Sequence, residues 1–204
     1  MEKIKSSLPN ILLSLTTVCL IAGVALSTTN KYTESAIAES KAAALRSAIR
    51  NVTPDFDNNP VEEHYKVAVI ESDSLSIYPA TMGGQWVGCA VECATKNGFS
   101  GLICLIVGFD KEGKIYNYTV LEHNETPGLG SKMETWFRTD KNRQNIVGRD
   151  LSKGLLKPVK DGGDVDAITA ATISTRAFLE AVNMAYAAIS GDNDASSGAT
   201  TSSE

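Results

Sequence analysis

The chain has 204 residues, of which 43% are hydrophobic and 21% charged, a balance that suits one packed domain of ordinary size. The formal net charge is -5, and no run of Lys and Arg with interleaved aromatics occurs, so we exclude a nucleic-acid-binding protein. The four cysteines and two histidines show no metal-ligand spacing, so we predict no metal site.

The N-terminus carries the strongest break in composition, because no charged residue occurs between Lys5 and Lys31. At about 1.5 Å per residue, residues 8–29 are long enough to cross a hydrocarbon core of about 30 Å. We therefore predict one transmembrane helix at residues 8–29. It follows a cytoplasmic N-terminus, residues 1–7, in which Lys3 and Lys5 favour the cytoplasmic side.

This orientation places the rest of the chain outside the cytoplasm. We predict a single-pass protein of the inner (cytoplasmic) membrane whose main domain, residues 30–189, lies on the extracytoplasmic or periplasmic side. The alternative is a secretory signal peptide cleaved at the small residues Ser35–Ala38. That site lies far beyond the apolar stretch, which is itself longer than the usual apolar core of a signal peptide, so we favour a retained anchor.

The main domain opens with a segment rich in Ala, Glu, Lys and Arg, Lys31–Val52, which is predicted to continue the helix outward. Closely spaced strands with tight turns follow, at Tyr65–Ile70, Leu75–Tyr78, Trp86–Thr95, Gly101–Phe109 and Ile115–Glu122. Further helices are predicted at Ser131–Thr139 and Ile173–Ile189. Because strands and helices are segregated, we predict the α+β class, an antiparallel β-meander with flanking helices.

Residues 190–204, rich in Ser, Gly and Thr, are predicted to be a flexible tail.

The cysteines of the main domain have two interpretations. Alternation in the third strand places Cys89 and Cys93 on one face together with Val87 and Val91. We favour three buried thiols, Cys104 included, that pack as small hydrophobic side chains. The alternative is a Cys93–Cys104 disulfide across the turn that joins their strands.

Two segments carry candidate chemistry. In HNETPGLGSKM, which begins at His123, Pro127 and Gly128 predict a turn whose backbone N–H groups approach a flat ligand. In the second segment, a loop rich in Gly and Asp leads to a helix that begins near Thr172 and Ser174. That helix N-terminus suits either capping by one of these hydroxyls or binding of a phosphate.

These segments resemble known motifs. DAITAATIS, from Asp166 to Ser174, resembles the flavinylation motif D-x-x-[ST]-[GA]-A-T-x-[ST], and HNETPGLG resembles a second motif of the same family. Together they resemble the FMN-binding subunits of ion-translocating, membrane-bound electron-transfer complexes: the G subunit of the Rnf complex and the C subunit of the sodium-pumping NADH:quinone reductase. The resemblance covers most of the chain, including the N-terminal anchor, and the compact length fits the G subunit better.

The resemblance implies an FMN-binding domain in which FMN is joined through its phosphate to the hydroxyl of Thr172. A dedicated flavin transferase, using FAD and a divalent metal, makes this phosphoester outside the cytoplasm, and recognition by it is implied for Asp166 and Thr169. Ala170 stands where the motif more often has Gly. The cofactor-binding residues implied by position are Glu125, Thr126, Gly128, Leu129, Gly130, Thr169, Ala170, Ala171 and Ser174.

The leading hypothesis is thus an electron-transfer flavoprotein subunit of an Rnf-type complex, which moves electrons between ferredoxin and NAD with ion translocation. It works with other membrane subunits, is not an enzyme alone, and has no catalytic residue, because Thr172 only accepts the cofactor. One alternative is the C subunit of the quinone reductase. Another is a non-redox binding module on a membrane stalk, whose Thr-rich segments are caps and turns.

The tail repeats the motif pattern, since DASSGATTS also matches it with Thr200 at the acceptor position. Few residue types make up this segment, so a match by coincidence is expected there. No apolar helix follows it, unlike the segment after Thr172. We therefore predict Thr172 as the main site of attachment and keep Thr200 as an additional candidate.

The retained anchor gives a first testable prediction. The mature protein isolated from membranes is expected to keep the apolar stretch, because residues 8–29 hold it in the bilayer. Mass spectrometry of its N-terminal peptide measures this. A mature chain that begins near Glu39 would show that the stretch is a cleaved signal peptide.

Overall fold

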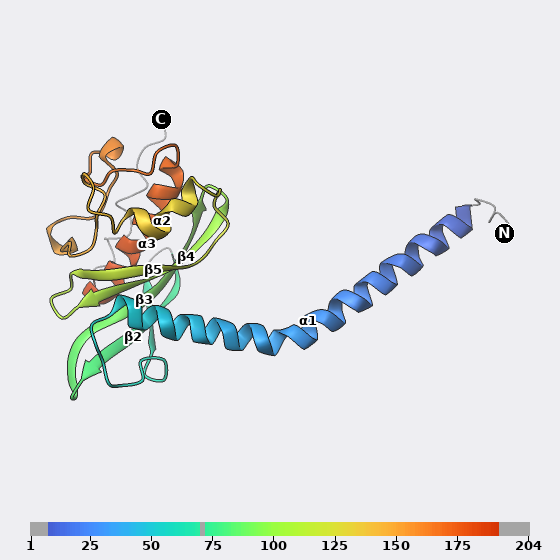
Figure 1. Ribbon diagram of the computed structural model, residues 1–204, viewed down its shortest axis with the longest axis horizontal. Helices are drawn as coiled ribbons and strands as arrows, with labels where there is room; N and C mark the ends of the chain where they lie inside the picture. The colour runs from blue at the N-terminus through green and yellow to red at the C-terminus, as the bar shows by residue number, and fades with distance from the viewer. Residues whose placement is uncertain (1–7, 70–71, 192–204) are drawn as a thin grey trace. The chain divides into compact units, whose positions relative to one another are not determined.

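A computed structural model describes residues 8–69 and 72–191 (Figure 1). The chain divides into two compact units, one up to Ala44 and one from Leu45 onward. Helix α1, Leu8–Val52, supplies most of the first unit and continues past residue 29, as predicted. It contains an 18-residue window with a mean hydropathy of 2.1, so by length and composition it is able to cross a membrane.

The second unit is built on one five-stranded antiparallel sheet in the order β1-β2-β3-β4-β5. The strands are β1 Tyr65–Val69, β2 Ser72–Met82, β3 Gln85–Gly98, β4 Gly101–Asp110 and β5 Ile115–His123. Each strand pairs with the next one along the chain, so the predicted meander and the α+β class are confirmed.

Strand β2 is much longer than the predicted Leu75–Tyr78. The added residues include Pro79, which has no backbone N–H to donate. Pairing with β1 ends at Ile77, and beyond it β2 pairs only with β3. Pro79 therefore lies where one side of the strand has no neighbouring strand, a position that tolerates proline.

Helices cover both faces of the sheet (Figure 1). Helix α3, Thr172–Ser190, packs with α2, Met133–Trp136, on one face. Phe178 of α3 lies at the centre of this core, stacked on Phe137 with ring centroids 4.5 Å apart and meeting Tyr118 edge-on at 5.0 Å. The last turns of α1 pack against Ile106 on the other face. Burial on both faces explains why β4 is an almost continuous apolar run.

The segment between α2 and α3 is mostly irregular. The helix predicted at Ser131–Thr139 is reduced to a 3-10 turn, Gly130–Lys132, followed by the single α-helical turn of α2. The Trp136 carbonyl accepts hydrogen bonds from the Thr139 N–H at 3.3 Å and the Gln144 amide at 3.2 Å. These bonds turn the chain out of the helix and into the loop. Two more 3-10 turns, Leu151–Lys153 and Val159–Asp161, complete the segment.

The cysteines are all free thiols. The alternative Cys93–Cys104 disulfide is wrong, because Cys93 is paired with Leu105 in the register of β3 and β4 and Cys104 with Ala94. Cys93 and Cys104 therefore point to opposite faces of the sheet. Cys89 and Cys93 are buried as predicted, and burial raises the pKa of the Cys89 thiol to about 12. Cys104 is only half-buried.

The central place of Phe178 gives the second prediction. Phe178→Ala is expected to lower the free energy of unfolding by about 3–5 kcal/mol, because it leaves a cavity between the sheet and α3. Tyr116→Ala, which removes an exposed aromatic side chain from β5, is the matched control and is expected to change it by less than about 0.5 kcal/mol. Urea unfolding of the full chain in detergent measures both, and equal losses would contradict the packing.

Candidate functional site

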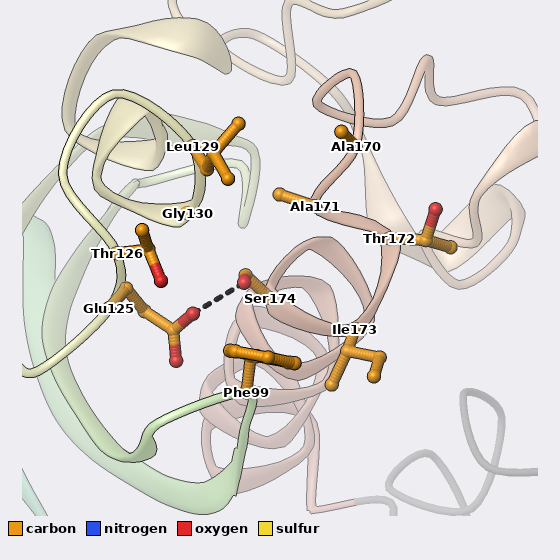
Figure 2. A pocket seen from close by; sticks show the side chains of 10 residues that line it. All are labelled: Phe99, Glu125, Thr126, Leu129, Gly130, Ala170, Ala171, Thr172, Ile173 and Ser174. Carbon is orange, nitrogen blue, oxygen red and sulfur yellow. Dashed lines mark hydrogen bonds between the residues drawn. The ribbon is translucent and has the colours of Figure 1, made fainter.

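Three segments far apart in the sequence meet around one cavity of about 340 Å³ (Figure 2). They are the tip of the β3–β4 hairpin, the loop after β5, and the start of α3. The cavity is lined by Phe99, Glu125, Thr126, Leu129, Gly130, Ala170, Ala171, Thr172, Ile173 and Ser174. Most of the predicted cofactor-binding residues are thus brought together, whereas Gly128 and Thr169 do not line this cavity.

The loop after β5 is a tight turn, as its Pro-Gly sequence predicts. Gly128 has a φ of 76° and donates its N–H to the Ser131 hydroxyl at 2.9 Å, so its role is to form the turn. Gly130 has a different role, because a side chain there would collide with the Glu125 carboxylate and the Ser174 hydroxyl. A residue without a side chain is needed for this loop to lie against α3.

Glu125 is the buried charged group of the cavity, with 4% of its surface exposed. Its carboxylate accepts the Ser174 hydroxyl at 2.5 Å and the Ser100 N–H at 2.9 Å. The Glu125 N–H in turn donates to Nδ1 of His123, which leaves the proton of His123 on Nε2, 3.0 Å from the Glu134 carboxylate. Glu125 and His123 therefore hold the loop and do not present free groups at its mouth.

The N-terminus of α3 is not capped by a side chain. Its N-cap residue is Ala171, and Thr172 is the first helical residue, so the alternative in which Thr172 or Ser174 caps the helix is wrong. The hydroxyl of Ser174 donates to Glu125 instead. The N–H groups of residues 172–174 precede the first helical hydrogen bond, from the Thr175 N–H to the Ala171 carbonyl. Uncapped N–H groups at the positive end of a helix favour an anion.

Thr172 lies on the side of the cavity opposite Glu125, with its side chain directed outward (Figure 2). It is half-buried and also lines a second cavity of about 640 Å³. Thr172 is thus the hydroxyl residue shared by the two cavities. A group joined to its oxygen has space on either side of the start of α3.

Asp166 and Thr169 belong to the second cavity. The Asp166 carboxylate accepts the Arg143 N–H at 3.0 Å, and the Asp166 carbonyl accepts the indole N–H of Trp136 at 2.9 Å. Asp166 therefore supports the chain that leads to Thr172, while Thr169 is exposed. Recognition of either residue by a flavin transferase stays a prediction.

The start of α3 is also held from the side of the preceding loop. Arg176 donates two hydrogen bonds to Asp161, from Nε at 2.7 Å and from the terminal nitrogen at 2.6 Å. The Arg176 guanidinium lowers the pKa of the Asp161 carboxyl below its usual value. This paired geometry keeps the loop against the helix one turn after Thr172.

Phe99 and Ile173 are the cavity residues that the sequence reasoning missed. Both are exposed, Phe99 by 67% and Ile173 by 48%. Phe99 stands in the two-residue turn between β3 and β4, where a large aromatic side chain is unusual. An aromatic residue within a polar turn is the sequence feature that could have identified Phe99 as a site residue.

Comparison with known proteins agrees with this geometry. Residues 98–187 match the family model of the FMN-binding domain, which spans the hairpin tip, the loop after β5 and α3. The chain is 34% identical to the G subunit of the ion-translocating oxidoreductase complex of Shewanella amazonensis, over 88% of this chain and 86% of that protein. It is 35% identical to the protein of the same name from Yersinia pestis, over 76% and 78% of the two chains.

The fold and the cavity therefore define an FMN-binding domain on a chain with one long apolar N-terminal helix. Similarity to these G subunits extends over most of both chains, far beyond the FMN-binding domain itself. The chain belongs to the G-subunit family of ion-translocating oxidoreductase complexes, and it is a membrane-anchored protein.

The backbone at Ala170 gives the third prediction. Ala170 has a φ of 61°, a left-handed conformation that costs an alanine about 1 kcal/mol and a glycine little. Ala170→Gly is therefore expected to leave the free energy of unfolding unchanged or to raise it by up to about 1 kcal/mol. The matched control is Ala171→Gly at a φ of -136°, which is expected to lower it by about 1 kcal/mol. Equal losses in urea unfolding would contradict the role of the left-handed turn.

Proposed function

We propose that the chain is an electron-transfer flavoprotein subunit of a membrane-bound, ion-translocating complex of the Rnf type, carrying FMN through a phosphoester to Thr172. The observation that carries this proposal is the place of Thr172. Its hydroxyl lies at an uncapped helix N-terminus, on the edge of a cavity built by the loop after β5. The family of the chain supports the same conclusion.

The residues around Thr172 fit the parts of FMN. Leu129, Ile173 and Phe99 offer apolar side chains for a flat aromatic ring system. The N–H groups of the first turn of α3 favour the negative charge that a phosphate diester keeps. When bound, FMN supplies the electron-transfer chemistry, and the protein orients the ring and limits its access to water.

Attachment requires a reaction at the Thr172 hydroxyl. We propose that a flavin transferase brings FAD with a divalent metal ion. The Thr172 oxygen forms a bond to the phosphorus of the FMN half, the phosphoanhydride bond to AMP breaks, and AMP leaves. The hydroxyl proton passes to a base of the transferase. Ala170 and Ala171 favour this step, because small side chains before Thr172 leave its hydroxyl reachable by a large partner.

The proposed location follows from the apolar helix. Lys3 and Lys5 precede the stretch at residues 8–29 and favour a cytoplasmic N-terminus, which puts residues 30–189 on the extracytoplasmic side. A covalent link prevents loss of the cofactor by dissociation there. The partners proposed are the other membrane subunits of the complex, and the electrons move between ferredoxin and NAD.

The alternative of a non-redox binding module is weaker. It treats the hydroxyls of the flavinylation motif as helix caps, yet neither Thr172 nor Ser174 caps α3. The alternative of the quinone reductase's C subunit shares the flavin chemistry. The long alignments with proteins named as G subunits favour the Rnf type.

Attachment at Thr172 gives the fourth prediction. Full-length chain made together with the family's flavin transferase is expected to carry one FMN increment by intact-mass measurement. Thr172→Val, which keeps the size of the side chain and removes the hydroxyl, is expected to carry none. Thr172→Ser keeps a hydroxyl at the same atom and is the matched control, expected to retain the flavin.

The tail is tested in the same measurement. Thr200→Val is expected to keep the increment, since few residue types make up the tail and its match to the motif is expected by coincidence. Residues 192–204 lie outside the described residues. A second increment in the unaltered chain that is lost in Thr200→Val would add Thr200 as a site. A full increment in Thr172→Val would overturn the proposal.

A further inference from the structure

The Glu125 carboxylate joins the β3–β4 turn to the first turn of α3, beside a second contact between the end of β3 and α3 in which the Asn97 amide donates to Glu180. One of its oxygens accepts the N–H of Ser100 in the β3–β4 turn, and the other accepts the hydroxyl of Ser174 in the first turn of α3. A buried carboxylate accepts hydrogen bonds strongly, and breaking one leaves a buried charge poorly solvated. The two bonds therefore hold the hairpin tip at a defined distance from the start of α3.

Glycines on both sides of the carboxylate make this contact possible. A side chain at Gly98 would come within 2.6 Å of one carboxylate oxygen, and a side chain at Gly130 within 2.5 Å of the other. Gly98 belongs to the end of β3 and Gly130 to the loop after β5. The carboxylate thus fits between these two residues because neither has a side chain.

The residue that this tie positions is Phe99, which directly precedes Ser100. Two-thirds of the Phe99 surface is exposed, and its ring lies beside the cavity next to Ile173 and Ser174 (Figure 2). Leu129 and Ile173 are also exposed around the same cavity, by 39% and 48%. An aromatic ring placed among these three side chains would remove their apolar surface from water.

We propose that Glu125 is a positioning residue that holds Phe99 over the ring of the flavin on Thr172, so that Phe99 shields one part of the ring from water. This inference rests on the proposed function, because it takes the flavin as the occupant of the cavity. The flavin is favoured over a protein partner because Phe99, Leu129 and Ile173 line the cavity that includes Thr172 itself.

The fifth prediction concerns the covering of the flavin. In flavin-loaded full-length chain, Phe99→Ala is expected to raise the iodide quenching constant of the flavin fluorescence several-fold, because the ring becomes open to the solvent. Glu125→Ala is expected to raise it in the same direction, and the double variant no further than the larger single effect. Tyr116→Ala, an exposed aromatic residue outside the cavity, is the control and is expected to leave it unchanged.

The tie itself is measured without the flavin. In unloaded full-length chain, amide exchange at Ser100 is expected to be on the order of 5–10-fold faster in Glu125→Ala, because its acceptor is lost. Phe99→Ala is expected to leave this amide protected. Glu125→Gln keeps the size of the side chain but only one accepting oxygen, so it is expected to give an intermediate exchange rate. This variant allows the same test if Glu125→Ala folds poorly.

The outcomes separate the two proposals. If the unaltered chain made with the transferase carries no FMN increment, both the proposed function and the covering role of Phe99 are overturned. A normal increment with unchanged iodide quenching in Phe99→Ala overturns the covering role alone. Unchanged Ser100 exchange in both Glu125 variants overturns the tie, whether or not the flavin is present.

Discussion

Packing of α3 against the sheet is the constraint on which the site depends. Phe178 and its neighbours bury one face of the helix against the sheet and α2, which fixes the position of the helix in the domain. Because the residue at the N-cap is Ala171, the positive end of the helix has no internal partner from a side chain. The first turn therefore offers N–H groups and the Thr172 hydroxyl at the edge of the cavity.

Charged and polar contacts then hold the neighbouring segments in place around this fixed point. Glu125 connects the hairpin tip to α3, and Arg176 connects the preceding loop to the same helix through Asp161. On the side of the second cavity, Asp166 connects the segment before α3 to the loop after α2 by accepting the Arg143 N–H. Glu125, Asp161 and Asp166 thus hold the segments that surround Thr172.

Much of this fold was predictable, because β3 and α3 show clear periodicity, β4 is an almost continuous apolar run, and turn residues or glycines follow all three. The length of β2 was not, since tolerance of Pro79 depends on where β1 stops pairing. The irregular segment before α3 is held by contacts between distant residues, such as Asn183 with the backbone of Leu156. Local patterns carry no information on such contacts. Phe99 was not predicted as a cofactor-binding residue, because a residue in a turn is ordinarily interpreted as part of a connecting loop.

The left-handed backbone at Ala170 explains why the motif more often has glycine at this position.

The central claim, a flavin phosphate on Thr172, is tested most directly by peptide mapping. Trypsin cleavage after Lys160 and Arg176 gives a peptide with four hydroxyl side chains, Thr169, Thr172, Ser174 and Thr175. Tandem mass spectrometry of the flavin-loaded protein is expected to find the FMN increment on Thr172. An increment on any other residue of this peptide, or an unmodified peptide from a protein that retains its flavin, would contradict the account.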